Sequence, residues 1–332
     1  MGKPILAVLA ALWLLAPAPA TAAEKLTVLM NFTIQGDHGP FFVAKAKGYF
    51  SGAGLDVDVQ RGFGSADTVK KIVTGAADIG FADPVPIVQA VAEGQQVKAI
   101  MGGYMQEPCA LYSVAEGGNI KTPKEMEGRT IGGPPGDICI ILLQAVMEKA
   151  GADFSKVKVQ NMDAPTRIPL LSAGRIDAAG SFFEKEVLFD KAIRAAGKTM
   201  VTWPYSKFIE KYSVMTIAGP KLLGKPDVLR RFTLALLRGY QDAVKDPDAA
   251  AATIMRMHPE FDRDYIHASS RTIGNVVWDE TTKAKGLGVL NAAKMAETIE
   301  LTAKYWKLGR KPAPGEIFTN EYIEWAHAQQ KE

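Results

Sequence analysis

The most constraining feature of the sequence is a regular alternation between residues 26 and 101. Four short apolar segments, typical of buried strands, are separated by polar loops and by longer segments with helical periodicity. The predicted strands are 26–30, 55–60, 78–82 and 97–101. Because parallel strands must be joined by crossover connections, most often helices, this alternation predicts an α/β fold with a mostly parallel sheet.

Three loops in this stretch have unusual sequences at the points where strands end. Residues 31–40 are polar and aromatic, residues 62–68 read GFGSADT, and residues 83–86 read DPVP. Ligands bind outside the carboxyl ends of strands in such folds, so we expect these loops to form half of a ligand site. The glycine-rich turn suits an anionic or acceptor group. It lacks the motif of a phosphate-binding loop or a dinucleotide fingerprint, and a plain helix cap by Ser65 is the alternative.

A second region of the sequence repeats this organisation. Strands are predicted at 130–132, 157–161, 176–182 and 199–203. Gly75 and Gly174 each lie three residues before an aspartate, Asp78 or Asp177, that begins a strand of small residues. A glycine there suits the left-handed residue at the end of a helix. The repetition predicts two similar lobes, and the sequence from residue 220 onward predicts mainly helices.

The first 23 residues have the organisation of a cleaved signal peptide. Lys3 supplies a positive charge, residues 5–15 form an apolar run, and residues 16–23 offer small residues for cleavage. The run is about half of the ~20 residues that a membrane-spanning helix needs, so we expect an exported, soluble protein in the periplasm. The small net charge of +3 gives no reason to expect nucleic acid or an anionic membrane as a partner.

The cysteines and histidines show no pattern of a metal or catalytic site. Cys109 and Cys139 are the only cysteines. They could form a disulfide in an oxidising compartment, but two separate buried thiols are favoured. No zinc-ligand spacing is present, and we expect neither a metal nor a cofactor. His38 has no nucleophile motif to serve, so a ligand-facing role is favoured over catalysis, with an exposed loop histidine as the alternative.

Two acidic residues of the second lobe have both a binding and a structural interpretation. Asp137 can cap the next helix, or it can face the ligand, where it would repel a sulfonate or carboxylate. Glu184 follows two aromatic residues at a strand end. It either binds a flat ring with N–H donors or positive charge, or stabilises the first turn of the next helix. With Asp37 and Asp83, these residues give the expected cleft an acidic character.

Several motifs resemble those of periplasmic substrate-binding proteins of ABC importers. The resemblance is to the branch that includes nitrate, sulfonate and taurine binders and thiamine-pyrimidine-precursor binders (NMT1/THI5-like and SsuA-like). It rests on these segments: FVAKAKGYF at 42–50, GLDV at 54–57, GS at 64–65, TGAADIG at 74–80, EGQQV at 93–97, KEMEGRTIGG at 124–133 and SAGRID at 172–177.

The resemblance implies a type II periplasmic-binding-protein fold with two lobes that close on a ligand by hinge motion. Lobe I would comprise residues 24–112 and 218–332, and lobe II residues 113–217. Crossing strands are expected near 110–114 and 215–219. It also implies a monomeric, non-enzymatic receptor that hands its ligand to a membrane permease. A pyrimidine-processing enzyme is a rival, although the cysteine-rich motif of that relative is absent.

The same resemblance indicates a ligand class. His38 and the Phe183-Glu184 pair match features of the pyrimidine-precursor binders, which favours an aromatic or nitrogen-heterocyclic metabolite over an alkanesulfonate or another small anion. We expect Phe41, Phe183 or Trp203 to stack on the ligand. The complete set of expected ligand-binding residues is Asn31, His38, Phe41, Gly64, Ser65, Asp83, Pro84, Tyr104, Gly136, Asp137, Phe183, Glu184 and Trp203.

Overall fold

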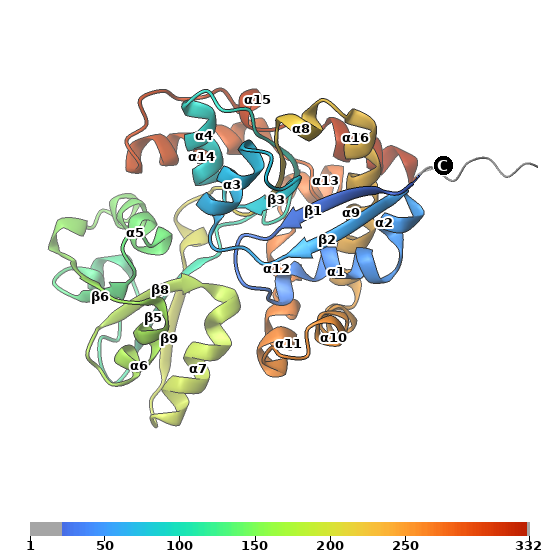
Figure 1. Ribbon diagram of the computed structural model, residues 1–332. Coiled ribbons are helices and arrows are strands. Elements are labelled where there is room, and N and C mark those ends of the chain that lie inside the picture. Colours follow the sequence, from blue (N-terminus) through green and yellow to red (C-terminus); the bar gives the residue numbers. More distant parts are fainter. Residues whose placement is uncertain (1–21, 331–332) are drawn as a thin grey trace, which may run out of the picture.

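The computed structural model describes residues 22–330, which form two α/β lobes side by side (Figure 1). Almost all of the predicted signal peptide lies outside this range. Within the described residues, no helix is long and apolar enough to cross a membrane. Each lobe contains one five-stranded mixed sheet, and the presence of two similar α/β lobes agrees with the sequence prediction.

The sheet of lobe I has the strand order β2-β1-β3-β10-β4. Its strands are β1 (Glu24–Leu29), β2 (Leu55–Gln60), β3 (Ile79–Ala82), β4 (Lys98–Gly102) and β10 (Met215–Ala218). β1 pairs in parallel with β2 and β3, whereas β10 is antiparallel to both of its neighbours. In β2, buried apolar residues alternate with exposed polar ones, the period that a half-buried strand requires.

The sheet of lobe II has the equivalent order β7-β6-β8-β5-β9. Its strands are β5 (Cys109–Val114), β6 (Thr130–Gly133), β7 (Lys158–Asn161), β8 (Ala178–Phe182) and β9 (Met200–Pro204). Again the first three strands in this order are parallel and the fourth, β5, is antiparallel to both of its neighbours. The two lobes therefore share one topology.

The repeated aspartates noted in the sequence occupy equivalent positions in the two lobes. The Asp78 carboxylate accepts the Thr27 backbone N–H at 2.8 Å, and the Asp177 carboxylate accepts the Thr130 backbone N–H at the same distance. In return, the backbone N–H of each aspartate donates to the carbonyl oxygen of the same threonine at 3.0 Å. Each aspartate thus fastens its own strand to the neighbouring parallel strand.

The chain passes between the sheets in segments 103–108 and 205–214. The prediction that strands near 110–114 and 215–219 cross between the lobes is wrong, because these residues form β5 and β10, which begin just after the passages end. β5 pairs only within lobe II and β10 only within lobe I. The passages themselves lie outside both sheets because they provide the connection between them.

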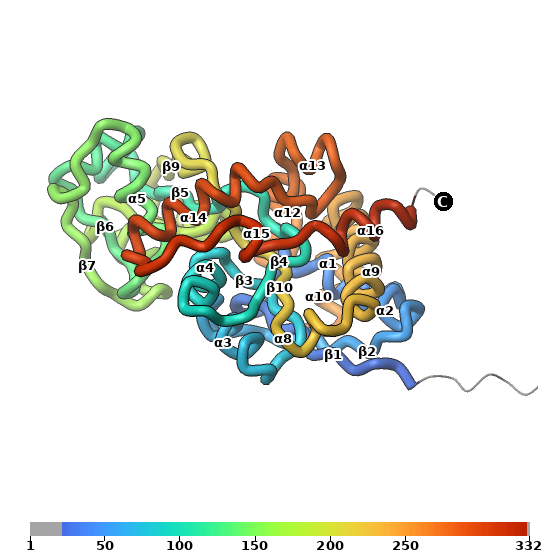
Figure 2. The backbone as a smooth tube through the Cα atoms, turned by 90° about the horizontal axis from the view of Figure 1, so that it is seen from above, coloured from blue at the N-terminus to red at the C-terminus, as the bar shows by residue number. Residues whose placement is uncertain are grey.

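Helices cover both faces of each sheet. In lobe II they are α5 (Ile138–Lys149), α6 (Arg167–Ser172) and α7 (Glu186–Ala195). In lobe I they are α1 (Gly39–Ala46), α2 (Tyr49–Gly52), α3 (Ser65–Val73), α4 (Pro84–Ala92), α8 (Pro220–Leu223), α9 (Pro226–Lys245), α10 (Pro247–Met257), α11 (Arg263–Arg271), α12 (Ile273–Val276), α13 (Glu280–Lys285), α14 (Ala292–Tyr305), α15 (Pro314–Ile317) and α16 (Glu321–Gln329). Figure 2 shows α14 running from lobe I towards α5 of lobe II.

A disulfide joins Cys109, the first residue of β5, to Cys139 in the first turn of α5. The prediction of two separate buried thiols is therefore wrong. Both cysteines are buried, as that prediction assumed. However, their Cα atoms lie 5.5 Å apart, within bonding range. The spacing of 30 residues in the sequence carried no information about this approach.

Candidate ligand-binding site

A cavity of about 570 Å³ lies between the two lobes. Lobe I lines it with the loops that follow β1, β2 and β3, and lobe II with the loops that follow β6 and β8. Arg167 of α6 and Trp306, at the end of α14, complete the wall. The volume falls within the range of small-molecule pockets.

The predicted site residues fall into two groups. Seven of them line the cavity: Asn31, Gly64, Ser65, Asp83, Gly136, Asp137 and Glu184. The other six do not: His38, Phe41, Pro84, Tyr104, Phe183 and Trp203. The polar loops are thus brought together as expected, whereas none of the predicted aromatic residues lines the cavity.

Phe41 and Trp203 are core residues, which does not agree with the stacking role expected for them. Phe41 is fully buried and packs edge-to-face against Phe81. Trp203 is buried in lobe II against Tyr205. Phe183 packs against the core of lobe I from its position in lobe II. The rings of Phe41 and Trp203 are covered by protein, and the partly buried ring of Phe183 does not line this cavity.

Other aromatic residues, which sequence reasoning missed, line the cavity instead: Phe32, Phe63, Phe182 and Trp306. Phe63 is 68% exposed and Phe32 is 42% exposed, unusual values for phenylalanine. Both lie inside loops that had been assigned to the site, so an aromatic residue in a polar loop was the available signal. Phe182 and Phe183 could not be told apart without the strand's orientation.

His38 lies behind Asn31 and does not contact the cavity. Its Nδ1 accepts the Gln35 backbone N–H at 3.3 Å, so its Nε2–H can donate to Asn31 Oδ1 at 2.9 Å. Burial lowers the pKa of His38, although Asp37 nearby opposes this shift. The neutral ring therefore holds the Asn31 amide by its oxygen. The amide nitrogen makes no hydrogen bond within the described residues.

Glu184 is a buried carboxyl group at the edge of the cavity. Its Oε1 lies 3.4 Å from Gln35 Nε2, and its Oε2 has no partner among the described residues. Burial, and then the charge of Asp37, raise the pKa of Glu184 to about 8. Asp37 itself accepts the hydroxyl proton of Tyr104. At neutral pH Glu184 therefore holds a proton and is a donor as well as an acceptor.

Asp83 faces the protein interior more than the cavity. Its Oδ1 caps α4 by accepting the Val85 backbone N–H at 2.9 Å. Its Oδ2 lies 3.4 Å from Nζ of Lys211, a fully buried residue of the second crossing segment. Lys211 also pairs with Glu107 of the first crossing segment at 2.8 Å. The Ser65 hydroxyl, which lines the cavity, accepts the Asp83 backbone N–H at 3.0 Å.

Asp137 is likewise engaged within the protein. Its Oδ1 caps α5 by accepting the Cys139 backbone N–H at 2.8 Å, and its Oδ2 pairs with Arg167 Nη1 at 2.9 Å. The capping role was expected, but Arg167 was missed, because 30 residues separate the two and no local pattern marks it. An ion pair neutralises Asp137, so the predicted repulsion of an anion does not follow.

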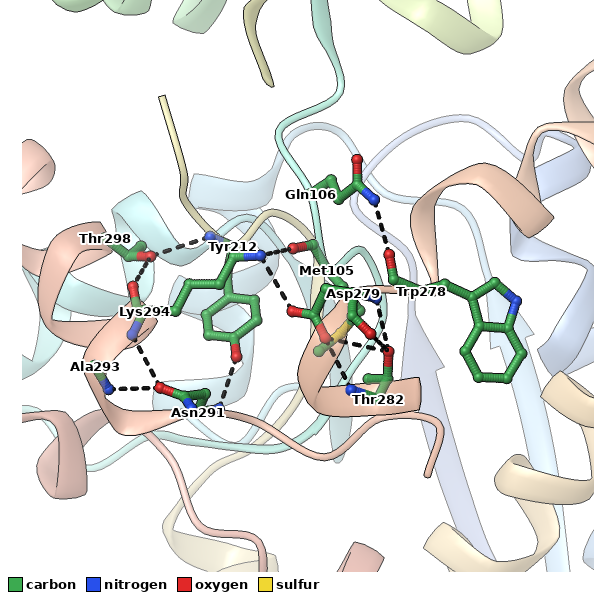
Figure 3. Close-up of polar contacts among 10 residues, drawn as sticks. All are labelled: Met105, Gln106, Tyr212, Trp278, Asp279, Thr282, Asn291, Ala293, Lys294 and Thr298. Atoms are coloured by element: carbon green, nitrogen blue, oxygen red, sulfur yellow. Dashed lines mark hydrogen bonds and ion pairs between the residues drawn. The ribbon is translucent and has the colours of Figure 1, made fainter. Parts of the chain in front are cut away.

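The first crossing segment is anchored to lobe I by residues that lie outside the cavity lining. Lys294 of α14 donates to the Met105 carbonyl oxygen and pairs with Asp279 at 3.1 Å (Figure 3). Gln106 Nε2 donates to the Trp278 carbonyl oxygen at 2.8 Å. This segment is therefore fixed to the residues around α13 and α14.

The second crossing segment is anchored to the same region. The Tyr212 backbone N–H donates to Thr298 Oγ1 at 3.1 Å, and its hydroxyl accepts the Asn291 backbone N–H at 2.7 Å (Figure 3). Both anchors belong to lobe I. We therefore expect the chain to bend nearer lobe II when the lobes move.

The described residues contain no group of three or more histidine, cysteine, aspartate or glutamate side chains that could hold a metal ion. The residues that face the cavity instead offer hydrogen bonds and aromatic surface. Such a site is suited to reversible capture of a small organic molecule.

Comparison with known proteins gives a consistent family. The sequence model of the family described as "NMT1/THI5 like" matches residues 35–250. The chain is 23% identical over 319 residues to the riboflavin-binding protein RibY of Chloroflexus aurantiacus, covering 93% of this chain and 89% of that protein. It is 23% identical to the formylaminopyrimidine-binding protein of Halalkalibacterium halodurans, covering 72% of each chain.

Two further similarities concern an enzyme and a solved structure. The chain is 24% identical to the 4-amino-5-hydroxymethyl-2-methylpyrimidine phosphate synthase of Schizosaccharomyces pombe, over 81% of this chain and 83% of that one. The periplasmic aliphatic sulphonate binding protein SsuA of Escherichia coli superposes with a TM-score of 0.70 at 13% identity, covering 90% of this chain and 99% of that one. The structural likeness shows the shared two-lobed fold.

Proposed function

Because the chain belongs to the NMT1/THI5-like family, we propose that it is the substrate-binding component of an ABC import system. Its ligand is a small aromatic or nitrogen-heterocyclic metabolite. The lobes close on this ligand by hinge motion, and the loaded protein delivers it to a permease in the membrane. The names of the riboflavin-binding and formylaminopyrimidine-binding relatives support this ligand class.

One observation carries the proposal, namely the aromatic side chains that line the cavity from both lobes. Phe32 and Phe63 come from lobe I, Phe182 from lobe II, and Trp306 from the helix that reaches lobe II. Hydrating exposed aromatic rings is unfavourable, so a flat ligand that covers them lowers the free energy of the complex. A nitrate or taurine molecule would cover little of this surface.

The site supports capture rather than turnover. Both ring nitrogens of His38 are engaged by Gln35 and Asn31, and the ring is fully buried. A general base must reach the proton that it removes, which this ring does not do. The similarity to a pyrimidine phosphate synthase makes an enzyme the second candidate. Conversion of a bound pyrimidine into a product by purified protein would show that the protein is an enzyme.

The same proposal covers location and partners. We propose that residues 1–23 direct export, that the mature protein works in the periplasm as a monomer, and that the permease is its protein partner. Analytical ultracentrifugation of the purified protein measures its oligomeric state, and fractionation of the source cells measures its location. A dimer in solution or a cytoplasmic mature protein would contradict them.

Native mass spectrometry of protein purified from its source tests the ligand class, because it reports the mass of any retained molecule. A thermal-shift panel then compares riboflavin, formylaminopyrimidine and simple benzoates with taurine, longer alkanesulfonates and nitrate. We expect stabilisation by at least one ring compound, reduced in Phe63→Ala. Phe261→Ala, which changes a phenylalanine outside the cavity, provides a control. Stabilisation by the sulfonates or nitrate alone would reject the aromatic ligand.

A further inference from the structure

Arg167 is a buried cation with unused hydrogen-bond donors at the cavity wall. It is 7% exposed, and it lines the cavity from the first turn of α6. Its Nη1 donates to Asp137 at 2.9 Å and to the Gly180 carbonyl oxygen at 2.8 Å, and its Nη2 donates to Ser181 Oγ at 3.2 Å. The Nε–H and the second Nη2–H have no partner within the described residues.

These contacts also fix the orientation of the guanidinium. Asp137, Gly180 and Ser181 hold it from the α5 cap and from the end of β8. A planar guanidinium held in this way presents its remaining N–H groups in a set direction. The ordering of this long side chain has therefore been achieved before any ligand arrives, which favours tight binding.

The other polar groups at the cavity wall are also mainly donors. The Asn31 amide is held by its oxygen, which leaves its nitrogen available. The Ser65 hydroxyl accepts a hydrogen bond from Asp83, which leaves its proton available. Lys185 lies at the rim, with Nζ 4.9 Å from the centre of the Phe32 ring. A ligand that satisfies these donors must carry hydrogen-bond acceptor atoms.

The carboxylates that gave the cleft its predicted acidic character are compensated. Asp83 shares Lys211 with Glu107, which does not line the cavity. Asp137 is paired with Arg167, while Lys185 adds a positive charge to the cavity lining. Glu184, whose pKa burial raises to about 8, holds a proton at neutral pH. An anionic or oxygen-rich ligand therefore meets no net negative wall, whereas a cationic ligand finds no free carboxylate at neutral pH.

We propose that Arg167 determines specificity by binding an acceptor group of the ligand, either a ring or amide carbonyl oxygen or a carboxylate. The ligand is then a neutral or anionic heterocycle that bears such an oxygen, and a ring carrying only an amine is rejected. This inference rests on the proposed capture of a ring compound and narrows its chemical class.

Matched pairs of probes test this specificity by isothermal titration calorimetry. One pair is formylaminopyrimidine and the free amine left when its formyl group is removed, and the other is benzoate and benzylamine. A hydrogen bond to a charged group corresponds to about a tenfold difference in affinity or more, so we expect the oxygen-bearing member to bind at least that much more tightly. Equal binding of both members, or preference for the amine, overturns the inference.

Variants assign the preference to Arg167. Arg167→Gln should bring the affinities of the two members within about twofold, since the charged donor is lost. Arg129→Gln, at an exposed arginine paired with Asp177, is the control and should keep the wild-type ratio. If Arg167→Gln unfolds the protein because Asp137 is left unpaired, Asp137→Asn/Arg167→Gln removes both charges together. An unchanged ratio in the folded variant rejects the role of Arg167.

The capture of ring compounds and the specificity role of Arg167 can be rejected separately. If wild-type protein binds neither member of either pair, nor riboflavin, the proposed capture of ring compounds fails, and the specificity role fails with it. If it binds ring compounds without regard to the oxygen, only the role of Arg167 fails.

Discussion

The two lobes share a strand order and strand directions but neutralise the carboxylate at the site in different ways. In lobe I, Asp83 lies beside Lys211, which is 1% exposed and comes from a crossing segment. In lobe II, Asp137 is paired with Arg167, which belongs to the same lobe and lines the cavity. The cation beside Asp83 is thus buried in the connection between the lobes, whereas the cation beside Asp137 lines the cavity.

This difference separates two tasks that one scaffold can perform. The Lys211 cluster joins Asp83 to both crossing segments, so it holds the lobe I wall and the hinge together. The hydrogen bonds of Arg167 are made to Asp137, Gly180 and Ser181, none of which belongs to a crossing segment, and the side chain lines the cavity. In the proposed division of tasks, lobe I provides the rigid base, and lobe II provides the charged group that binds the ligand.

The largest effect on stability is expected when Lys211, the buried cation beside Asp83, is removed. Lys211→Met leaves Asp83 and Glu107 unpaired in the interior, which should cost about 3–5 kcal/mol of unfolding free energy. Arg167→Met should cost less, because its surroundings open to the cavity. Urea denaturation measures both, and Lys211→Met/Glu107→Gln should recover part of the loss. A greater loss for Arg167→Met would contradict the division of tasks.

The disulfide is the next test, because it belongs to lobe II alone. Removing it with Cys109→Ala/Cys139→Ala should cost about 2–4 kcal/mol. Hydrogen exchange should quicken in α5 and β5, while the strands of lobe I keep their protection. The wild-type protein under strong reductant serves as the comparison. Equal loss of protection in both sheets would show that the lobes do not unfold separately.

The repeated aspartates allow a direct comparison between equivalent positions. Asp78→Ala and Asp177→Ala each leave a strand N–H without its acceptor, at a cost of about 1–3 kcal/mol. Asp78→Ala should cost more, because the Asp78 side chain is 9% exposed whereas that of Asp177 is 33% exposed. Thermal unfolding of the two variants measures the difference. The reverse order would show that burial does not govern these two contacts.

The smallest effect concerns pH and the carboxyl group of Glu184. Its pKa in the folded protein, about 8, lies above the ordinary value of 4.5, so the folded state holds a proton that the unfolded state has lost. This contribution to stability therefore falls as the pH rises between these values. Relative to wild type, Glu184→Gln should gain about 1 kcal/mol or more between pH 5 and pH 8. Denaturation at the two pH values measures this gain, and a constant difference would exclude the raised pKa.

Local sequence patterns predicted two similar α/β lobes, whereas the type II arrangement of the lobes was implied by the family resemblance. The strand and helix periodicity and the glycine-aspartate repeat are properties of neighbouring residues. Gly75 and Gly174 indeed have φ values of 74° and 70°, the left-handed conformation expected at those helix ends. The polar loops after the strands were placed together because carboxyl ends of parallel strands share an edge of the sheet.

The features that could not be predicted depend on contacts between residues that are far apart in the sequence. Arg167 meets Asp137, and Cys109 meets Cys139, across 30 residues of sequence in each case. Phe41 and Phe32 are both aromatic residues near the first loop, yet one is buried and the other is exposed. Only the packing of the lobes decides which ring reaches the cavity.

The position of β10 has a consequence for how the chain acquires its structure. β10 lies between β3 and β4, yet it is made only after all of lobe II. The lobe II sheet is built from one uninterrupted stretch, whereas the lobe I sheet stays divided until β10 arrives. We expect lobe II to fold first and lobe I to close later, since distant pairings form slowly. Pulse-labelling hydrogen exchange would record this order. Because the lobe I sheet cannot be completed early, the lobe I segments of a newly made chain would also remain unfolded for longer.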